Sequence, residues 1–286
     1  MTVTECVGSG TTQLMTAGLP SSEAKLDSEV LARHVLGWNR TEYLTFRARA
    51  ASRTFIEKFE TLLDRRSRRE PVSQILGYRE FWGLRFGVSK AVLTPRPETE
   101  FLVEEVITIA THQNVPDVTI FEIGTGSGCI SIALAKELPQ ARIIATDVSE
   151  DALMMANKNS SAHNTGEKIS WLQTSYLENV QGLADFIVSN PPYIPESSAS
   201  QLLPEVRNHE PEIALYSGKD GLNFIRKLLD LSSHRLVKGG HLLFEFGLGQ
   251  ETAINKIAAE HPQLSILKIR RDYQDIPRIA IIKRVR

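Results

Sequence analysis

The feature that constrains the fold most is a glycine-rich turn between an apolar strand and a helix. Residues 118–123 form a short apolar run that predicts a buried strand, and helical apolar spacing begins at Cys129. Between them lie Gly124-Thr125-Gly126-Ser127-Gly128. Glycines at such a turn let the backbone approach a nucleotide-like ligand closely. The pattern predicts an α/β fold with a parallel, doubly wound sheet.

A second predicted strand, 142–147, follows the helix and ends in an acid, Asp147. In a doubly wound sheet an acid at this place can bind a ribose hydroxyl group. Asp147 and the glycine turn are therefore candidate cofactor ligands. A tight turn that binds nothing would show the same glycines, so a further signal downstream has to decide between the two interpretations.

That signal is Asn190-Pro191-Pro192-Tyr193, which follows the apolar run 185–189. Neither proline has an N–H to donate and each has a fixed φ, so the turn is stiff and its carbonyls can point away from the sheet. Asn190 adds a side-chain acceptor and Tyr193 a flat aromatic face. Two acceptors beside an aromatic plane suit a planar group that carries an NH2. The alternative is a stiff turn without a ligand, because Asn-Pro is a common turn signal.

An amide or aryl amine nitrogen is a poor nucleophile, because its lone pair is delocalised into the adjacent π system. Acceptors on both N–H bonds, which hold the nitrogen in line with an electrophile, favour attack by that lone pair. The order of glycine turn, acid and Asn-Pro-Pro-Tyr is much more specific than any one of the three motifs.

These motifs, with Glu122 two residues before the first glycine of the turn, resemble the class I S-adenosylmethionine-dependent methyltransferases that act on amino groups. More narrowly, the chain resembles the peptide-chain release factor glutamine methyltransferases. This resemblance runs from about residue 70 to the C-terminus, and before residue 70 it rests on length and helical character. It is carried by Leu93-Thr94-Pro95-Arg96-Pro97-Glu98-Thr99-Glu100, Gln74-Ile75-Leu76-Gly77, Phe81-Trp82-Gly83 and Val188-Ser189-Asn190-Pro191-Pro192-Tyr193-Ile194.

The resemblance implies a seven-stranded Rossmann-like methyltransferase sheet with a small N-terminal helical domain. Residues 1–75 would form a helical substrate-docking domain, 76–94 a β-hairpin bridge and 95–286 the methyltransferase domain. S-adenosylmethionine would be the cofactor, bound by Gly124, Thr125, Gly126, Ser127, Gly128, Asp147, Tyr176 and Asn190. The substrate would be bound by Asn190, Pro191, Pro192 and Tyr193, of which Asn190, Pro191 and Tyr193 would be catalytic. Ser175 stands where many members of the family carry an acid, which departs from the pattern for binding the adenine amino group.

The implied activity is methylation of the side-chain amide nitrogen of glutamine in the Gly-Gly-Gln motif of class 1 release factors. One alternative is a ribosomal-protein glutamine methyltransferase, which has the same chemistry. Another is an adenine-amino DNA or RNA methyltransferase, because a flipped adenine presents the same planar NH2. A third is a binding protein that keeps the cofactor pocket without turnover. The formal net charge of −1 lacks the basic footprint of a nucleic-acid-binding protein, so we expect no direct contact with nucleic acid.

The remaining features predict a cytoplasmic protein that makes no contact with a membrane. They do not determine the oligomeric state, for which we expect a monomer. The N-terminus lacks the apolar core of a signal peptide, and no apolar run approaches the length of a membrane span. Cys6 and Cys129 form neither a disulfide framework nor a metal-binding spacing, so we expect no metal.

The N-terminal region predicts a small helical module. Residues 1–20 are rich in Thr, Ser and Gly, which predicts a frayed arm, with a short helix in it as the alternative. Helices are expected from the cap Ser21-Ser22 to Gly37, from about Thr41, and from Ser52 or Arg53 to Arg69. The basic run Arg65-Arg66-Ser67-Arg68-Arg69 predicts a solvated helix end, with contact to an acidic or RNA-rich partner as the alternative.

Overall fold

The computed structural model describes residues 1–113 and 117–286. Contacts between residues divide the chain into two compact units. Unit 1 comprises Met1–Tyr78 and Leu203–His209, and unit 2 comprises Arg79–Leu202 and Glu210–Arg286. Among the described residues, no helix combines the length and the apolar character that a bilayer span requires.

Unit 1 is helical, and its core is formed by the apolar faces of its longer helices. Leu14, Leu31 and Phe59 are among the fully buried side chains there. Asn39 and Ser52 each cap the following helix by accepting a hydrogen bond from a backbone N–H. The elements of unit 1 are α1 (Val3–Thr16), α2 (Ser21–Leu36), α3 (Arg40–Phe46), α4 (Arg53–Ser67), α5 (Val72–Leu76) and α9 (Pro204–His209).

The first helix shows that the expectation of a frayed N-terminal arm is wrong. Thr2 and Glu5 form a capping box, in which each side chain accepts a hydrogen bond from the other residue's backbone N–H. At Gly10 a Cβ atom would lie 2.7 Å from the Ser28 hydroxyl of α2, so only glycine lets the two helices approach this closely. The small residues that obscure the helical period in the sequence are therefore the ones that permit the packing.

Two other details of unit 1 differ from the predictions. Helix α2 begins at Ser21, but Pro20 occupies the N-cap position and no side chain caps the helix. The prediction that Ser21 and Ser22 provide the cap is therefore wrong, whereas the end of the helix at Gly37, with φ +67°, is confirmed. Helix α5 was not predicted, because it has only five residues and no complete apolar period.

Arg66, in the basic run at the end of α4, is not solvated as predicted. The Arg66 side chain is 2% exposed and contacts the carboxylates of Glu23, Asp27 and Glu205 at 2.6, 2.7 and 2.7 Å. A buried guanidinium is costly unless it is paired, and these carboxylates supply the pairing. Because Arg69 also contacts Glu205, at 2.8 Å, the ion pairs hold α9 within unit 1.

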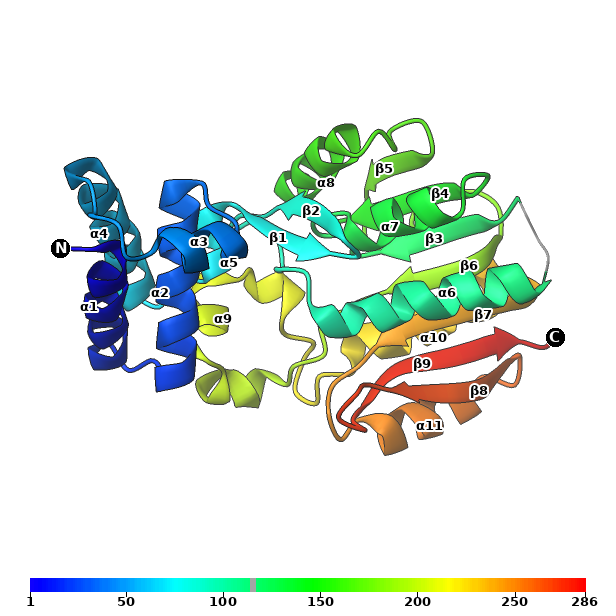
Figure 1. Ribbon diagram of the computed structural model, residues 1–286. Helices are drawn as coiled ribbons and strands as arrows, with labels where there is room; N and C mark the ends of the chain where they lie inside the picture. The colour runs from blue at the N-terminus through cyan, green and yellow to red at the C-terminus, as the bar shows by residue number, and fades with distance from the viewer. Residues whose placement is uncertain (114–116) are drawn as a thin grey trace. The chain divides into compact units, whose positions relative to one another are not determined.

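The described residues of unit 2 contain a seven-stranded sheet in the order β5-β4-β3-β6-β7-β9-β8 (Figure 1), which confirms the predicted α/β methyltransferase fold. Strands β3 to β7 pair in parallel, and β9 is antiparallel to both β7 and β8. The strands are β3 (Thr119–Ile123), β4 (Arg142–Asp147), β5 (Ile169–Gln173), β6 (Ala184–Ser189), β7 (Leu236–Glu245), β8 (Leu264–Arg271) and β9 (Pro277–Arg284).

Helices cover both faces of this sheet, as the alternation of strand and helix along the chain requires. They are α6 (Glu100–Gln113), α7 (Cys129–Glu137), α8 (Glu150–Ala162), α10 (Asn223–Arg235) and α11 (Glu251–Ala259), with short 3-10 turns η1 (Pro97–Thr99), η2 (Glu196–Gln201) and η3 (Glu212–Ala214). Ahead of the sheet, β1 (Tyr78–Phe81) and β2 (Leu84–Gly87) form the predicted hairpin.

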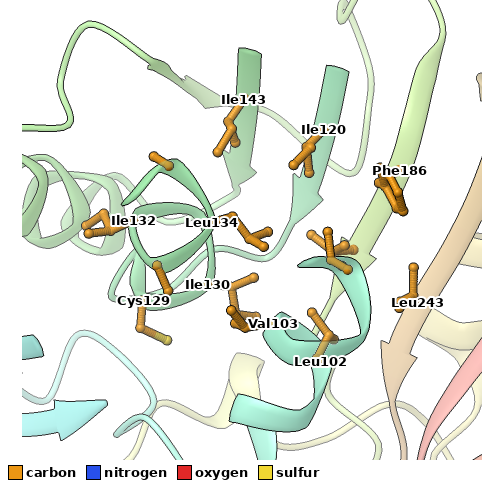
Figure 2. Packing of buried hydrophobic residues seen from close by; sticks show 14 of the residues in the cluster. Leu102, Val103, Ile120, Cys129, Ile130, Ile132, Leu134, Ile143, Phe186 and Leu243 are labelled. Atoms are coloured by element: carbon orange, nitrogen blue, oxygen red, sulfur yellow. The ribbon is translucent and has the colours of Figure 1, made fainter. Parts of the chain in front are cut away.

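Among the described residues of unit 2, two large hydrophobic clusters lie one on each face of the sheet, and a small third one is formed by Val88, Val92 and Ala152. Figure 2 shows the first, where Leu102 of α6 and Leu134 of α7 pack against side chains of β3, β4, β6 and β7. On β3, Ile120 belongs to this cluster and Phe121 to the second large one, where residues of α10 and α11 cover it. This alternation explains why the strand reads as a continuous apolar run, since both of its faces are buried.

Strand β7 contains two adjacent glycines, a pair that usually marks a turn. The strand nevertheless runs through Gly239 and Gly240 from Leu236. At Gly240 a Cβ atom would lie 3.0 Å from the carbonyl oxygen of Asp185, and the register with β6 shifts next to this point. Glycine here allows a close approach of two backbones at a bulge rather than a turn.

Candidate active site

The carboxyl ends of the central strands of unit 2 open onto a cavity of about 420 Å³, a size typical of small-molecule sites. Because β3 lies between β4 and β6, the sheet order places the glycine turn beside Asp147 on one side and Asn190 on the other. The predicted site residues that line the cavity are Gly124, Thr125, Gly126, Ser127, Asp147, Tyr176, Asn190 and Pro192.

The glycine turn owes its shape to backbone angles that favour glycine and to one buried acid. Gly124, Gly126 and Gly128 have φ of +74°, +54° and +80°. The fully buried Glu122 accepts hydrogen bonds through Oε2 from the Thr125 hydroxyl at 2.8 Å, from the Ser131 N–H at 3.1 Å and from the Ser131 hydroxyl. Burial raises the pKa of Glu122 to about 7, although these hydrogen bonds oppose the shift. Glu122 thus ties the strand, the turn and the start of α7 together.

Asp147 holds the same turn from the neighbouring strand. Its Oδ2 accepts a hydrogen bond from the Gly126 N–H at 2.9 Å, and its Oδ1 accepts one from the Ser149 N–H at 3.0 Å. A carboxylate has about four lone-pair sites, so each oxygen retains the capacity to accept another hydrogen bond. Since Asp147 lines the cavity, it is suited to bind the hydroxyl groups of a ribose.

An aromatic pair forms another part of the cavity wall. The rings of Tyr176 and Phe224 lie 4.6 Å apart between centroids, and both residues line the cavity. Tyr176 was predicted, but Phe224 of α10 was not, because its place in an amphipathic helix resembles that of a core residue. Ser175 also lines this wall, at the position where many members of the resembling family carry an acid.

Asn190 presents an unpaired acceptor at the end of β6. Its Nδ2 donates to the Thr99 hydroxyl oxygen at 3.0 Å. Its Oδ1 is buried and has no hydrogen-bond partner in the part of the chain that the structure describes. Buried acceptors of this kind are rare, because leaving one unsatisfied costs free energy. Because Asn190 lines the cavity, this oxygen is suited to accept an N–H from a ligand.

The rest of the Asn-Pro-Pro-Tyr turn supports this arrangement. The Tyr193 hydroxyl donates to Glu245 Oε1 at 3.0 Å, and the Tyr193 carbonyl accepts from Gln250 Nε2 at 2.9 Å. Pro191 is buried, and neither Pro191 nor Tyr193 is among the residues that line the cavity. Stacking of a substrate on Tyr193 and binding by Pro191 therefore stay predictions.

Gly128 has a packing role at the start of α7. A Cβ atom there would lie 3.0 Å from the Ala156 Cβ and 3.1 Å from the Trp171 ring, and Gly128 is not among the lining residues. Contact of Gly128 with a cofactor stays a prediction.

A segment far along the chain closes the wall beside Asn190. The Ile194 N–H donates to the Leu215 carbonyl at 2.9 Å, and the Ser217 N–H donates back to the Ile194 carbonyl at 3.1 Å. This pairing brings Ile213 and Tyr216 to the cavity. The described residues contain no group of three or more His, Cys, Asp or Glu side chains that could hold a metal ion.

Comparisons with known proteins bear on the family and the fold of this chain. Residues 5–77 match the PrmC N-terminal domain, and residues 97–205 match the methyltransferase small domain. Among solved structures, the chain resembles the catalytic domain of hMettl16 in complex with MAT2A 3'UTR hairpin 6, with 19% identity and a TM-score of 0.59 over 79% of this chain and 82% of that one. It also resembles a methyltransferase from Pyrococcus furiosus, with 19% identity and a TM-score of 0.53 over 71% of this chain and 90% of that one. These likenesses show the fold.

Relatives of higher identity cover nearly the whole chain. The release factor glutamine methyltransferase of Bradyrhizobium diazoefficiens is 36% identical over 264 residues, which are 92% of this chain and 89% of the relative. The enzyme of the same name from Haemophilus influenzae is 36% identical over 273 residues, or 92% of each chain. That from Agrobacterium fabrum is 34% identical over 274 residues, or 95% of this chain and 94% of the relative. The chain therefore belongs to the release factor glutamine methyltransferase family.

Proposed function

We propose that this protein transfers the methyl group of S-adenosylmethionine to the side-chain amide nitrogen of the glutamine in the Gly-Gly-Gln motif of class 1 release factors. The observation that carries the proposal is the buried, unpaired Oδ1 of Asn190, a residue that lines the cavity; this oxygen is an acceptor for an N–H group. The same cavity is lined by the glycine turn and Asp147, which suit a nucleoside.

The residues of the cavity fit S-adenosylmethionine by their chemistry. Asp147 would accept hydrogen bonds from its ribose, and the glycine turn would let its polar end approach the backbone. Tyr176 and Phe224 would flank its adenine. When bound, this cofactor supplies an electrophilic methyl group on a positively charged sulfur.

The substrate amide needs orientation rather than a strong base. Asn190 Oδ1 would accept one N–H of the glutamine amide and the Pro191 carbonyl the other, with the Tyr193 ring beside the amide plane. Held in this way, the nitrogen would have its lone pair free to attack the methyl group that the cofactor supplies. The nitrogen would gain that methyl group as the bond from the group to sulfur breaks, and the surplus proton on the nitrogen would leave to solvent.

Selection of the right protein requires contacts beyond one glutamine side chain, which offers little to discriminate. We assign that role to unit 1 as a docking surface for the release factor. With a formal net charge of −1, the chain lacks the broad basic surface that nucleic-acid binding favours. We expect a monomer that acts in the cytoplasm without a membrane or nucleic-acid partner.

The test is mass spectrometry of a purified class 1 release factor after incubation with the protein and labelled S-adenosylmethionine. We expect one methyl group on the Gly-Gly-Gln peptide with the wild type. Asn190→Ala should abolish the transfer, whereas Asn157→Ala, at an exposed position of α8, should preserve it.

Three other outcomes would contradict the proposal. Label on a glutamine of a ribosomal protein instead would assign the protein to that related activity. Label on adenine in DNA or RNA would assign it to nucleic-acid methylation. Binding of the cofactor without transfer to any of these substrates would indicate a binding protein.

A further inference from the structure

Asn190 stands at one end of a buried hydrogen-bonded chain that no sequence motif indicates. Its Nδ2 donates to Thr99 Oγ1 at 3.0 Å, and the Thr99 hydroxyl donates to Glu245 Oε2 at 2.6 Å. Thr99 is 1% exposed and Glu245 is 2% exposed. The chain therefore links the end of β6 through η1 to the end of β7, out of contact with solvent.

Glu245 fixes the direction of every hydrogen bond in this chain. Its second oxygen, Oε1, accepts from the Tyr193 hydroxyl at 3.0 Å, so both carboxylate oxygens act as acceptors. An ionised carboxylate can only accept, and a threonine hydroxyl has a single hydrogen to donate. Because that hydrogen points to Glu245, Thr99 can only accept from Asn190.

This direction decides which end of the Asn190 amide faces the cavity. If the amide turned over, Oδ1 would meet the lone pairs of Thr99 Oγ1, and two acceptors would be in contact without a proton between them. A buried polar contact of that kind is unfavourable because neither group is satisfied. The amide is thus held with its NH2 toward Thr99 and its Oδ1 free to accept.

Burial and the groups around Glu245 act on its charge in opposite directions. Burial raises the pKa of Glu245, but the hydrogen bonds from Thr99 and Tyr193 and the positive charge of Arg278 oppose that shift. Charge-assisted hydrogen bonds of this type are stronger than those between neutral groups.

We propose that Thr99 and Glu245 are positioning residues that set the orientation of the Asn190 amide, so that Oδ1 accepts an N–H from the substrate. This inference rests on the proposed function, because it assigns the Asn190 acceptor to a substrate NH2. Without these hydrogen bonds, the Asn190 amide would populate both orientations. The reversed orientation would place the NH2 group of Asn190 against the NH2 group of the substrate. Of the residues that would bind the cofactor, only Asn190 belongs to this chain, so the loss should fall mainly on the rate of transfer.

The first variant to test is Thr99→Val, which keeps the shape and removes the hydroxyl. Loss of a group that orients a ligand through hydrogen bonding typically costs 10–100-fold in activity, so we expect kcat for the release factor to fall by about that factor. The dissociation constant of S-adenosylmethionine, measured by calorimetry, should change by less than about threefold. Thr99→Ser retains the hydroxyl and should restore most of the lost kcat.

Thr165→Val is the matched control. Thr165 lies in the turn after α8 and is also 1% exposed. Its hydroxyl is hydrogen-bonded to the hydroxyl of Ser160 in α8, and Thr165 is not one of the residues hydrogen-bonded to Asn190 or Glu245. We expect it to lower the melting temperature as Thr99→Val does and to leave kcat unchanged.

Glu245→Gln tests the direction of the chain. Its amide NH2 can donate to Thr99, which then turns its own hydrogen toward Asn190 and permits the reversed orientation. We expect kcat to fall, and the double variant Thr99→Val/Glu245→Gln to be no slower than Thr99→Val, because both changes act through Asn190.

The inference would be overturned by a Thr99→Val variant with wild-type kcat, or by one that loses affinity for the cofactor and keeps its kcat. An equal loss of kcat in Thr165→Val would overturn it too. So would a double variant in which the losses of kcat from the two single changes multiply. A wild-type protein that transfers no methyl group to the release factor would reject the proposed function instead. Methyl transfer by the wild type thus separates the two failures.

Discussion

Asn190, Thr99 and Glu245 come from distant parts of the sequence and meet at the carboxyl ends of β6 and β7. Asn190 could be predicted from its motif, since an amide before two prolines is unusual at the end of a buried strand. Thr99 lies in the segment 93–100 that carries the family resemblance, but neither it nor Glu245 could be recognised as a partner of Asn190 until the strand order is known. The same holds for Phe224, which reaches the cavity from a helix whose apolar spacing is that of an ordinary core element.

Gly221 gives a prediction at this scale. Its φ is +76°, and a Cβ atom there would lie 2.3 Å from the Tyr193 carbonyl oxygen. Gly221→Ala should therefore displace the Asn-Pro-Pro-Tyr turn and lower kcat by at least about 10-fold, as small misplacements in active sites do. Gly182→Ala is the control, because Gly182 has φ +85° with no atom within 4 Å of the added Cβ. Equal activity of the two variants, assayed on the release factor, would contradict the prediction.

At the scale of elements, long periodic segments were predicted well and short or small-residue segments were not. Helices α2 and α4 show clear apolar spacing, whereas α1 is rich in small residues that serve close packing. Helix α9 has six residues, too few for a helix to be stable by itself, and it owes its place to ion pairs with α4. Such tertiary contacts leave no local trace in the sequence.

Arg66 gives a prediction at this scale. Arg66→Met would remove the cation and leave the carboxylates of Glu23, Asp27 and Glu205 facing one another. Loss of one partner from a buried ion pair costs about 3–5 kcal/mol, so unit 1 should lose stability by about that amount. Hydrogen exchange should show reduced protection in α4 and complete loss of protection in α9.

Arg53→Met is the control, because Arg53 pairs with Glu57 at a position where its side chain is 93% exposed. Its effect should stay within about 0.5 kcal/mol. Unchanged protection of α9 in Arg66→Met would show that the ion pairs do not hold this helix.

For the whole molecule, the order of motifs along the chain was sufficient to predict the sheet. Three motifs stand at the ends of three parallel strands: a glycine turn, an acid and an Asn-Pro-Pro-Tyr turn. They can meet at one edge of the sheet only if those strands are neighbours, and β4, β3 and β6 are adjacent in the sheet. The shape of the cavity could not be predicted, because residues 211–218 enter its wall through backbone pairing with Ile194.

Stability as a function of pH gives a prediction for the whole molecule. Burial in β7, and the nearby charge of Lys283, lower the pKa of His241 to about 4. An unfolded chain binds the proton near pH 6.5, so between pH 6.5 and 4 only the unfolded state is protonated and stability falls as pH falls. Between pH 7 and 4.5 this histidine should cost the wild type about 2–3 kcal/mol, at about 1.4 kcal/mol for each pKa unit.

The measurement is urea unfolding of the wild type and of His241→Gln at both pH values. Burial raises the pKa of Glu122 to about 7, so its contribution to the stability of the folded protein decreases as pH rises from about 4.5. This contribution is the same in the wild type and in the variant, and comparing the two proteins cancels it. The same pH dependence in both proteins would show that His241 is not buried in its neutral form.

The central claim is that this site methylates an amide NH2 held by Asn190. The most direct measurement compares two release factors as substrates, one with glutamine and one with glutamate at the last position of the Gly-Gly-Gln motif, by tandem mass spectrometry after reaction with labelled S-adenosylmethionine. Glutamate has no N–H to donate, so the account predicts one methyl group on the glutamine nitrogen and none on the glutamate protein. Equal labelling of both proteins, or label outside this motif, would contradict it.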